Sequence, residues 1–96
     1  MDPTMSEYQA AAELLRALAS PLRIAIVLRL QDGPKAVHEL VDALGAPQPL
    51  VSQHLRVLRG ARLVHAQRHG REVAYALVDT HVSKIALAAV QHADET

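Results

Sequence analysis

The sequence contains no cysteine, tryptophan or phenylalanine, and its aromatic side chains are two tyrosines. The absence of cysteine excludes disulfide bonds and thiolate metal sites. Because half of the residues are hydrophobic, the core has to be built from Leu, Val, Ile and Ala, which favours closely packed helices. The 96 residues correspond to one small domain, residues 1–96. A core of this size is modest, so we expect dimerisation to bury further surface.

Long apolar runs are also missing, and none approaches the roughly 20 residues that a membrane-spanning helix needs. Residues 1–8 lack the basic and then apolar pattern of a secretory signal. We therefore expect a cytoplasmic protein with no membrane partner.

Acidic residues are absent between Asp42 and Glu72, although the net charge of the chain is zero. A local basic block on a neutral chain is typical of phosphate binding, although a solvated basic face would look the same in this stretch alone. The stretch holds five of the ten Lys and Arg residues and three histidines: Arg56, Arg59, Arg62, Arg68, Arg71, His54, His65 and His69.

Apolar periodicity predicts four helices, at about residues 6–18, 21–31, 35–44 and 48–59. The first should place Ala10, Leu14, Leu15 and Leu18 on one side, and the second is apolar enough to form the buried centre. The third and fourth helices, joined by a tight turn at Gly45, are typical of a helix-turn-helix spanning about residues 35–59.

A change to a period of about two predicts a hairpin at about residues 63–78, with strands at 63–67 and 71–78. We expect Arg68-His69-Gly70 to form the turn, because glycine can supply the positive φ of a tight hairpin. A last helix follows at about residues 80–93. The predicted fold is mostly α with a β-hairpin wing, a homodimeric winged helix-turn-helix in the order α-α-α-α-β-β-α.

The polar face of the fourth helix and the tip of the wing are the predicted DNA-binding surface. Amide, hydroxyl and guanidinium groups are the side chains that bind base edges and phosphates of double-stranded DNA. The candidate residues are Gln48, Ser52, Gln53, Arg56, Arg59, Arg68, His69 and Arg71. We expect no ligand role for His54, a surface or packing residue, and no specific role for His38.

Four residues with nitrogen and oxygen donors flank the last helix: Asp79, His81, His92 and Glu95. His81 and His92 lie about 20° apart around the helix axis but about 16 Å apart along it, so one ion cannot join both ends of one helix. An antiparallel copy of the helix would bring the two ends together and form two equivalent sites. Such donors suit a divalent transition metal, namely Zn²⁺, Co²⁺ or Ni²⁺. A solvated helix with an acidic tail is the competing interpretation.

Two segments and the metal set resemble the ArsR/SmtB family of metal-responsive winged-helix regulators. Residues 18–23, Leu-Ala-Ser-Pro-Leu-Arg, are similar to the family's opening motif, and residues 44–55 are similar to its recognition-helix stretch. The spacing Asp79-x-His81 and His92-x-x-Glu95 resembles the inter-subunit site of its zinc sensors. The resemblance implies a dimer joined by its first and last helices. It also implies a repressor that binds operator DNA without metal and releases it when metal binds.

The sequence departs from the family pattern at three places. Ala36-Val37-His38 stands where relatives that sense thiophilic ions carry Cys-x-Cys, so that site is missing. Pro47 replaces the Ser or Thr that caps the recognition helix in many members. Glu95 stands where nickel-sensing relatives often have His, which favours zinc.

Two alternatives stay open from the sequence, namely a winged-helix regulator with a structural metal or no metal, and an activator. A metallohydrolase is disfavoured because four protein ligands leave no open position on a tetrahedral ion, and the sequence has no activated nucleophile or phosphate loop. We therefore predict that the chain is not an enzyme.

Overall fold

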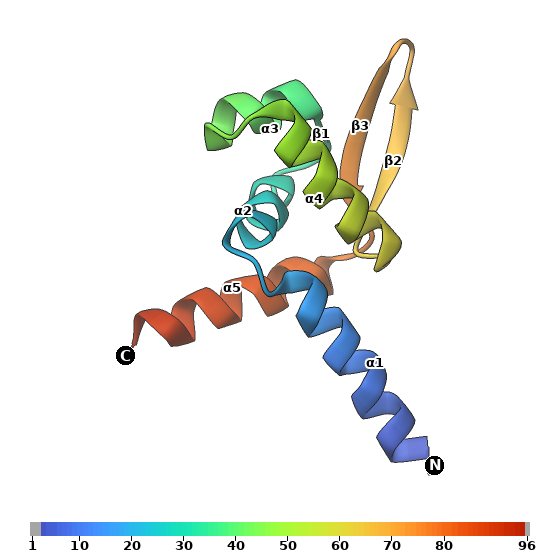
Figure 1. The fold of residues 1–96 in the computed structure, drawn as a ribbon, viewed down its shortest axis with the longest axis vertical. Coiled ribbons are helices and arrows are strands. Elements are labelled where there is room, and N and C mark those ends of the chain that lie inside the picture. The colour runs from blue at the N-terminus through green and yellow to red at the C-terminus, as the bar shows by residue number, and fades with distance from the viewer. Residues whose placement is uncertain (1–2, 96) are drawn as a thin grey trace.

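The computed structural model describes residues 3–95 and forms a helical body from which a hairpin and a helix project (Figure 1). Within this range no helix is long and apolar enough to cross a bilayer. The predicted winged helix-turn-helix class is confirmed. The elements in order are α1 (Pro3–Leu18), α2 (Pro21–Leu30), β1 (Lys35–Ala36), α3 (Val37–Leu44), α4 (Gln48–Gly60), β2 (Val64–His69), β3 (Glu72–Leu77) and α5 (Thr80–Asp94).

The short strand β1 is an element that the sequence did not predict, and it corrects the expected start of the third helix. Lys35 and Ala36 pair with Tyr75 and Ala74 of β3, in a sheet of order β1-β3-β2. The Oε1 atom of Glu39 accepts a hydrogen bond from Ala36 N at 2.9 Å, which fixes the first turn of α3. The helix therefore begins at Val37 rather than at residue 35.

Local signals set the other helix ends as expected. The hydroxyl of Ser20 accepts from Arg23 N at 3.3 Å, and Pro21 occupies the first turn of α2, where its missing N–H costs nothing. Gly45 ends α3 with a left-handed φ of 66°. The N-cap of α4 is Pro47, and its side chain makes no cap hydrogen bond, as the sequence indicated.

The packing of α2 against α4 forms the centre of the core. Ile26 and Val27 of α2 are fully buried, and so are Val51 and Leu58 of α4, with Leu55 only 1% exposed. These three α4 residues follow the predicted i, i+4, i+7 pattern, so the opposite face of α4 is left for solvent or a partner.

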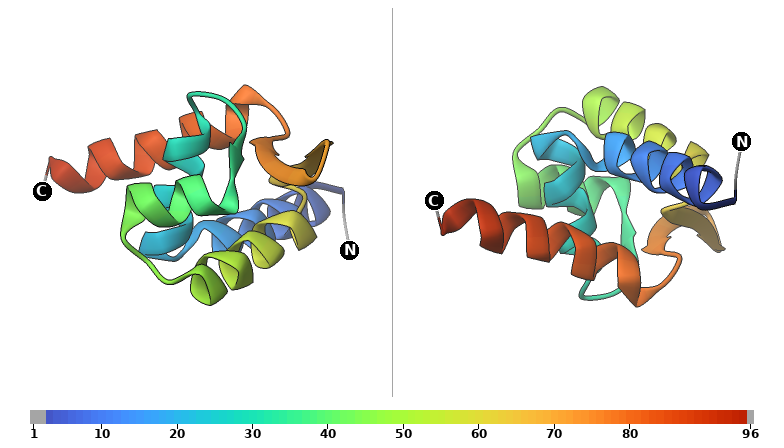
Figure 2. Two further views of the ribbon diagram at one scale, coloured as in Figure 1. Left: turned by 90° about the horizontal axis from the view of Figure 1, so that it is seen from above. Right: turned by 90° about the horizontal axis from the view of Figure 1, so that it is seen from below.

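The first helix packs through its C-terminal half, where Leu14 lies against the core and Leu18 is buried as predicted, so the predicted apolar side is correct at these two positions and wrong at Ala10 and Leu15. Ala17 and Leu18 are buried, whereas Leu15 is 55% exposed and Ala10 is also exposed. The N-terminal part of α1 extends away from the body, and α5 extends in a different direction (Figures 1 and 2). Both projecting helices therefore offer surface to a second molecule.

The hairpin turn begins two residues later than predicted and keeps Gly70. His69 pairs with Glu72, so Gly70 and Arg71 alone form the turn, and Arg68 and His69 belong to β2. Gly70 has a φ of 63° at the first turn position, as a type II′ turn requires. On β3 the most buried residue is Ala76, whereas Val73, Tyr75 and Leu77 are half-buried.

A side-chain contact joins the wing to α3. His38 Nε2 lies 2.9 Å from Glu72 Oε1, and both side chains are well exposed. The hydrogen bond to Glu72 raises the pKa of His38 above 6.5. Slight burial acts in the opposite direction, while the charges of Glu72, Glu39 and Asp42 add to the rise. The contact with Glu72 of the wing is therefore stronger when His38 is protonated.

We predict that shortening Leu55 destabilises the fold while shortening Leu50 on the same helix does not. Leu55→Ala should lower the free energy of unfolding by about 2–5 kcal/mol, because it leaves a cavity in the core. Leu50 is 39% exposed, so Leu50→Ala should cost well under about 1 kcal/mol. Urea denaturation of both variants checks this. A loss below about 1 kcal/mol for Leu55→Ala would mean that Leu55 is not a core residue.

The His38–Glu72 contact should also respond to pH. Because the pKa of His38 is raised in the folded protein, its stabilising contribution is present below pH 6.5 and is lost as pH rises through the folded-state pKa. Glu72→Gln should lower that pKa toward 6.5. An NMR titration of the His38 ring in the parent and the variant measures the shift. An unchanged pKa would refute the pairing.

Candidate functional site

The outer face of α4 carries a continuous polar surface. Gln48, Ser52 and Arg56 follow one another at four-residue spacing, so they form one row along the helix, beside the buried stripe of Val51, Leu55 and Leu58. Gln53 and Arg59 lie on the same outer side, and all of these side chains except half-buried Ser52 are exposed. This surface presents hydrogen-bond donors and acceptors. The buried side of the same helix packs against the core and fixes its position.

The wing carries the second part of the predicted DNA surface. Arg68, His69 and Arg71 are all exposed at its far end, as the sequence predicted. Arg68 and His69 are neighbours on β2, so strand alternation places them on opposite faces of the hairpin. The Nε2 atom of His69 lies 3.4 Å from Gln67 Oε1. Arg68 and His69 therefore point to different faces of the wing and cannot both contact the same group of a partner.

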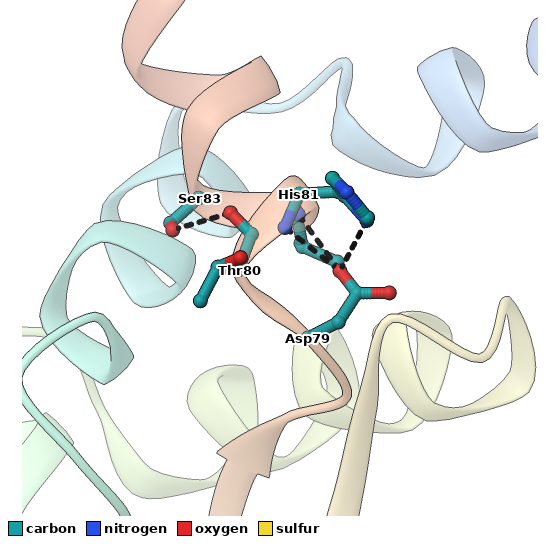
Figure 3. A network of polar contacts seen from close by, with 5 residues as sticks. Asp79, Thr80, His81 and Ser83 are labelled. Atoms are coloured by element: carbon teal, nitrogen blue, oxygen red, sulfur yellow. Dashed lines mark hydrogen bonds and ion pairs between the residues drawn. The ribbon is translucent and has the colours of Figure 1, made fainter.

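The first pair of candidate metal ligands lies at the start of α5. Asp79 is the N-cap, and its Oδ1 atom accepts from His81 N at 2.9 Å and from Val82 N at 3.3 Å (Figure 3). The same Oδ1 atom lies 3.6 Å from His81 Nδ1. The side chains of His81 and Asp79 are 79% and 50% exposed. The three contacts use Oδ1, so Oδ2 is the atom through which this carboxylate can bind a cation.

The second pair lies at the other end of the same helix. His92 Nδ1 lies 3.7 Å from Glu95 Oε2, and both side chains are exposed. The helix separates the two pairs by about 16 Å along its axis. Within residues 3–95 no three ligating side chains of one protomer gather into a metal site. One chain therefore offers two half-sets of nitrogen and oxygen donors, one at each end of α5.

Two polar contacts near the recognition surface were missed by the sequence reasoning. His38, which was given no specific role, contacts Glu72 of the wing. His54, interpreted as a surface or packing residue, is half-buried and contacts Arg23 of α2. Each partner is more than thirty residues away in sequence. Helical or strand periodicity carries no signal for such contacts.

Comparison with known proteins identifies the family. The profile described as "Bacterial regulatory protein, arsR family" matches residues 20–66. The HTH-type transcriptional repressor SmtB of Mycobacterium tuberculosis is 58% identical over 93 residues, which are 97% of this chain and 69% of that protein. The HTH-type transcriptional regulator NmtR of the same species is 44% identical over 91 residues, covering 92% of this chain and 76% of that protein.

Solved structures agree with this assignment. The homodimeric winged helix-turn-helix DNA-binding domain Mb0332 of Mycobacterium bovis superposes with a TM-score of 0.85 at 27% identity, covering 99% of this chain and 88% of that one. Reduced HlyU of Vibrio cholerae superposes with a TM-score of 0.82 at 31% identity, covering 92% and 93%. The chain therefore belongs to the ArsR family of bacterial regulatory proteins, and it is a winged helix-turn-helix transcriptional regulator that binds DNA rather than an enzyme.

Proposed function

We propose that the protein is a dimeric repressor that binds double-stranded operator DNA and releases it when a divalent transition metal binds between the two α5 helices. The observation that carries the proposal is the placement of two exposed His–carboxylate pairs at the two ends of α5, in a chain whose α4 presents a polar recognition face. The relative SmtB is itself a transcriptional repressor by name. One small chain thus holds both a DNA-reading unit and half-sets of metal donors.

Exposed apolar surface on α1 and α5 supports a dimer. Tyr8 is 60% exposed and Leu15 is 55% exposed on α1, and Val90 is 40% exposed on α5. The winged-helix neighbour Mb0332 is described as homodimeric. A twofold interface made from the projecting helices would cover these side chains and would use the same surface of both protomers.

The donor chemistry supports a metal site completed by a second chain. An antiparallel α5 would bring Asp79 and His81 beside the partner's His92 and the partner's Glu95. Ala88, an exposed small residue between the two pairs, would permit close approach of the helices. Two imidazoles and two carboxylates suit Zn²⁺ first, and Ni²⁺ or Co²⁺ with added ligands. The ion would supply a link between protomers, because its ligands come from both.

DNA binding would divide between α4 and the wing. Gln48, Ser52 and Gln53 have the amide and hydroxyl groups that read base edges in a major groove. Arg56 and Arg59 at the later turns of α4, with the cationic wing residues, would neutralise phosphates. Since two half-sites lie about 34–36 Å apart on one face of DNA, a rotation of the protomers within the dimer would misalign one recognition helix.

We predict that Zn²⁺ weakens operator binding by about 5–150-fold, the usual range of allosteric coupling. The probe is the duplex that the metal-free protein enriches from a random-sequence pool, and binding is measured by fluorescence anisotropy. His81→Ala with His92→Ala should abolish the effect. Glu95→Gln should weaken it, whereas Asp94→Asn, a neutralised carboxylate one residue away, should leave it intact. Binding that ignores Zn²⁺, Ni²⁺ and Co²⁺ would refute the metal switch while leaving the DNA-binding role.

The contribution of the arginines to DNA binding should be measurable from the salt dependence of the affinity. Each phosphate contact contributes about 0.9 to the slope of log K against log salt concentration. Because the proposed dimer carries two copies of Arg56, Arg56→Gln should therefore reduce the magnitude of that slope by about 1.8 for every duplex that both protomers contact. Lys84→Gln is the control, because this exposed cation belongs to α5, which packs on α2 and extends away from α4 (Figure 1). Equal slopes for the parent protein and Arg56→Gln would remove Arg56 from the interface.

A further inference from the structure

The side chain of Arg23 joins three helices. Its Nε atom donates to the carbonyl oxygen of Ala17 at 2.5 Å, and its Nη2 atom donates to the carbonyl oxygen of Arg16 at 3.5 Å. Its Nη1 atom lies 3.0 Å from Nδ1 of His54. Arg23 belongs to α2, the two carbonyls belong to the last turn of α1, and His54 belongs to the recognition helix α4.

The chemistry of these contacts fixes their direction. A guanidinium group has only donors, so Nδ1 of His54 must accept, and the hydrogen of the neutral ring lies on Nε2. The last carbonyls of α1 carry partial negative charge, which favours a cation, and although the Arg16 carbonyl also accepts from Ala19 N at 3.1 Å, the Ala17 carbonyl accepts from Arg23. Because its donors lie in one rigid plane, the guanidinium holds α1 and α4 in one geometry.

The first helix depends on this point because only its C-terminal half packs against the body, with Leu14 as its outermost core residue. Ala17 is 8% exposed and Leu18 is 5% exposed, whereas Tyr8, nearer the free end, is 60% exposed. A helix of 16 residues is about 24 Å long, so a tilt of about 10° at its attached end moves the far end by about 4 Å. The orientation of α1 is therefore sensitive to contacts at residues 16–18.

We propose that Arg23 is a positioning residue, which fixes the angle between α1 and the recognition helix and thereby sets the half-site spacing that the dimer accepts. The inference rests on the proposed function, in that α1 is taken to contribute to the dimer. If α1 holds the protomers together, the angle between α1 and α4 determines the distance and direction between the two recognition helices. Arg23 itself lies on α2 and acts through His54.

A purely structural role for Arg23 would have a different signature. Loss of its hydrogen bonds would then lower stability and the folded fraction, while folded dimers kept the same spacing preference. A positioning role predicts a change in which spacings are accepted. The dependence of affinity on half-site spacing therefore separates the two roles.

The test uses metal-free protein and the inverted repeat that the parent protein enriches from random-sequence duplexes. The repeat is remade with its half-sites one and two base pairs closer and farther apart, and a duplex with one half-site serves as reference. The variants are Arg23→Gln, Arg23→Lys, His54→Leu and His54→Asn. Asn places an amide oxygen near the position of the histidine Nδ1, so it can still accept from Arg23. Circular dichroism establishes that each variant is folded at the assay temperature.

We expect the parent protein to bind one spacing at least about 10-fold more tightly than its neighbours, because both half-sites must be engaged together. Arg23→Gln, Arg23→Lys and His54→Leu should flatten this profile to within about threefold without changing affinity for the single half-site. His54→Asn should retain the sharp profile. If any of these variants does not fold, the other variants still decide between the two roles.

Two outcomes would overturn the inference, and they differ in what else they affect. A sharp profile in folded Arg23→Gln and His54→Leu overturns the positioning role alone and leaves the regulator as proposed. A parent protein that enriches no sequence, or accepts all spacings equally, contradicts the proposed dimeric operator binding, and the inference fails with it.

Discussion

The packing of α2 against α4 is the contact on which the other elements depend. Ile26 and Val27 lie against Val51, Leu55 and Leu58 in a core made without a single Phe, Trp or Cys. Because α4 buries a narrow apolar stripe there, its remaining surface is free to be polar. The sheet is attached to the same centre through Val64, which is also fully enclosed. The recognition surface and the wing are thus both held by one aliphatic cluster.

Much of this architecture could be predicted from local sequence. The inward positions of α4 follow from the helical period, and the ends of α2 and α3 follow from Ser20-Pro21 and Gly45. The placement of histidine–carboxylate pairs at both ends of the last helix also follows from spacing alone. These features share one property, since each is decided by residues within a few positions of one another.

The features that escaped prediction depend on distant parts of the chain. The strand β1 has two residues and exists only because β3, about forty residues later, supplies pairing partners. The register of the hairpin is decided by pairing along its whole length. In the observed register Arg68 and His69 belong to β2 rather than to the turn. The contacts of His38 and His54 join separate elements. The exposure of Leu15 follows from how little of α1 meets the body.

The use of Asp79 as both helix cap and metal ligand, which we propose, has a consequence for the evolution of this regulator. Its Oδ1 atom caps α5 whether or not an ion is present, and the helix favours Asp, Asn, Ser or Thr at that position for this reason alone. Of these four, only Asp adds a full negative charge for a cation. A lineage that lost its response to metal could change His81 without disturbing the helix, yet position 79 would still be confined to capping residues. An aspartate kept at position 79 therefore does not indicate that a relative still senses metal. A histidine kept at position 81 would indicate it.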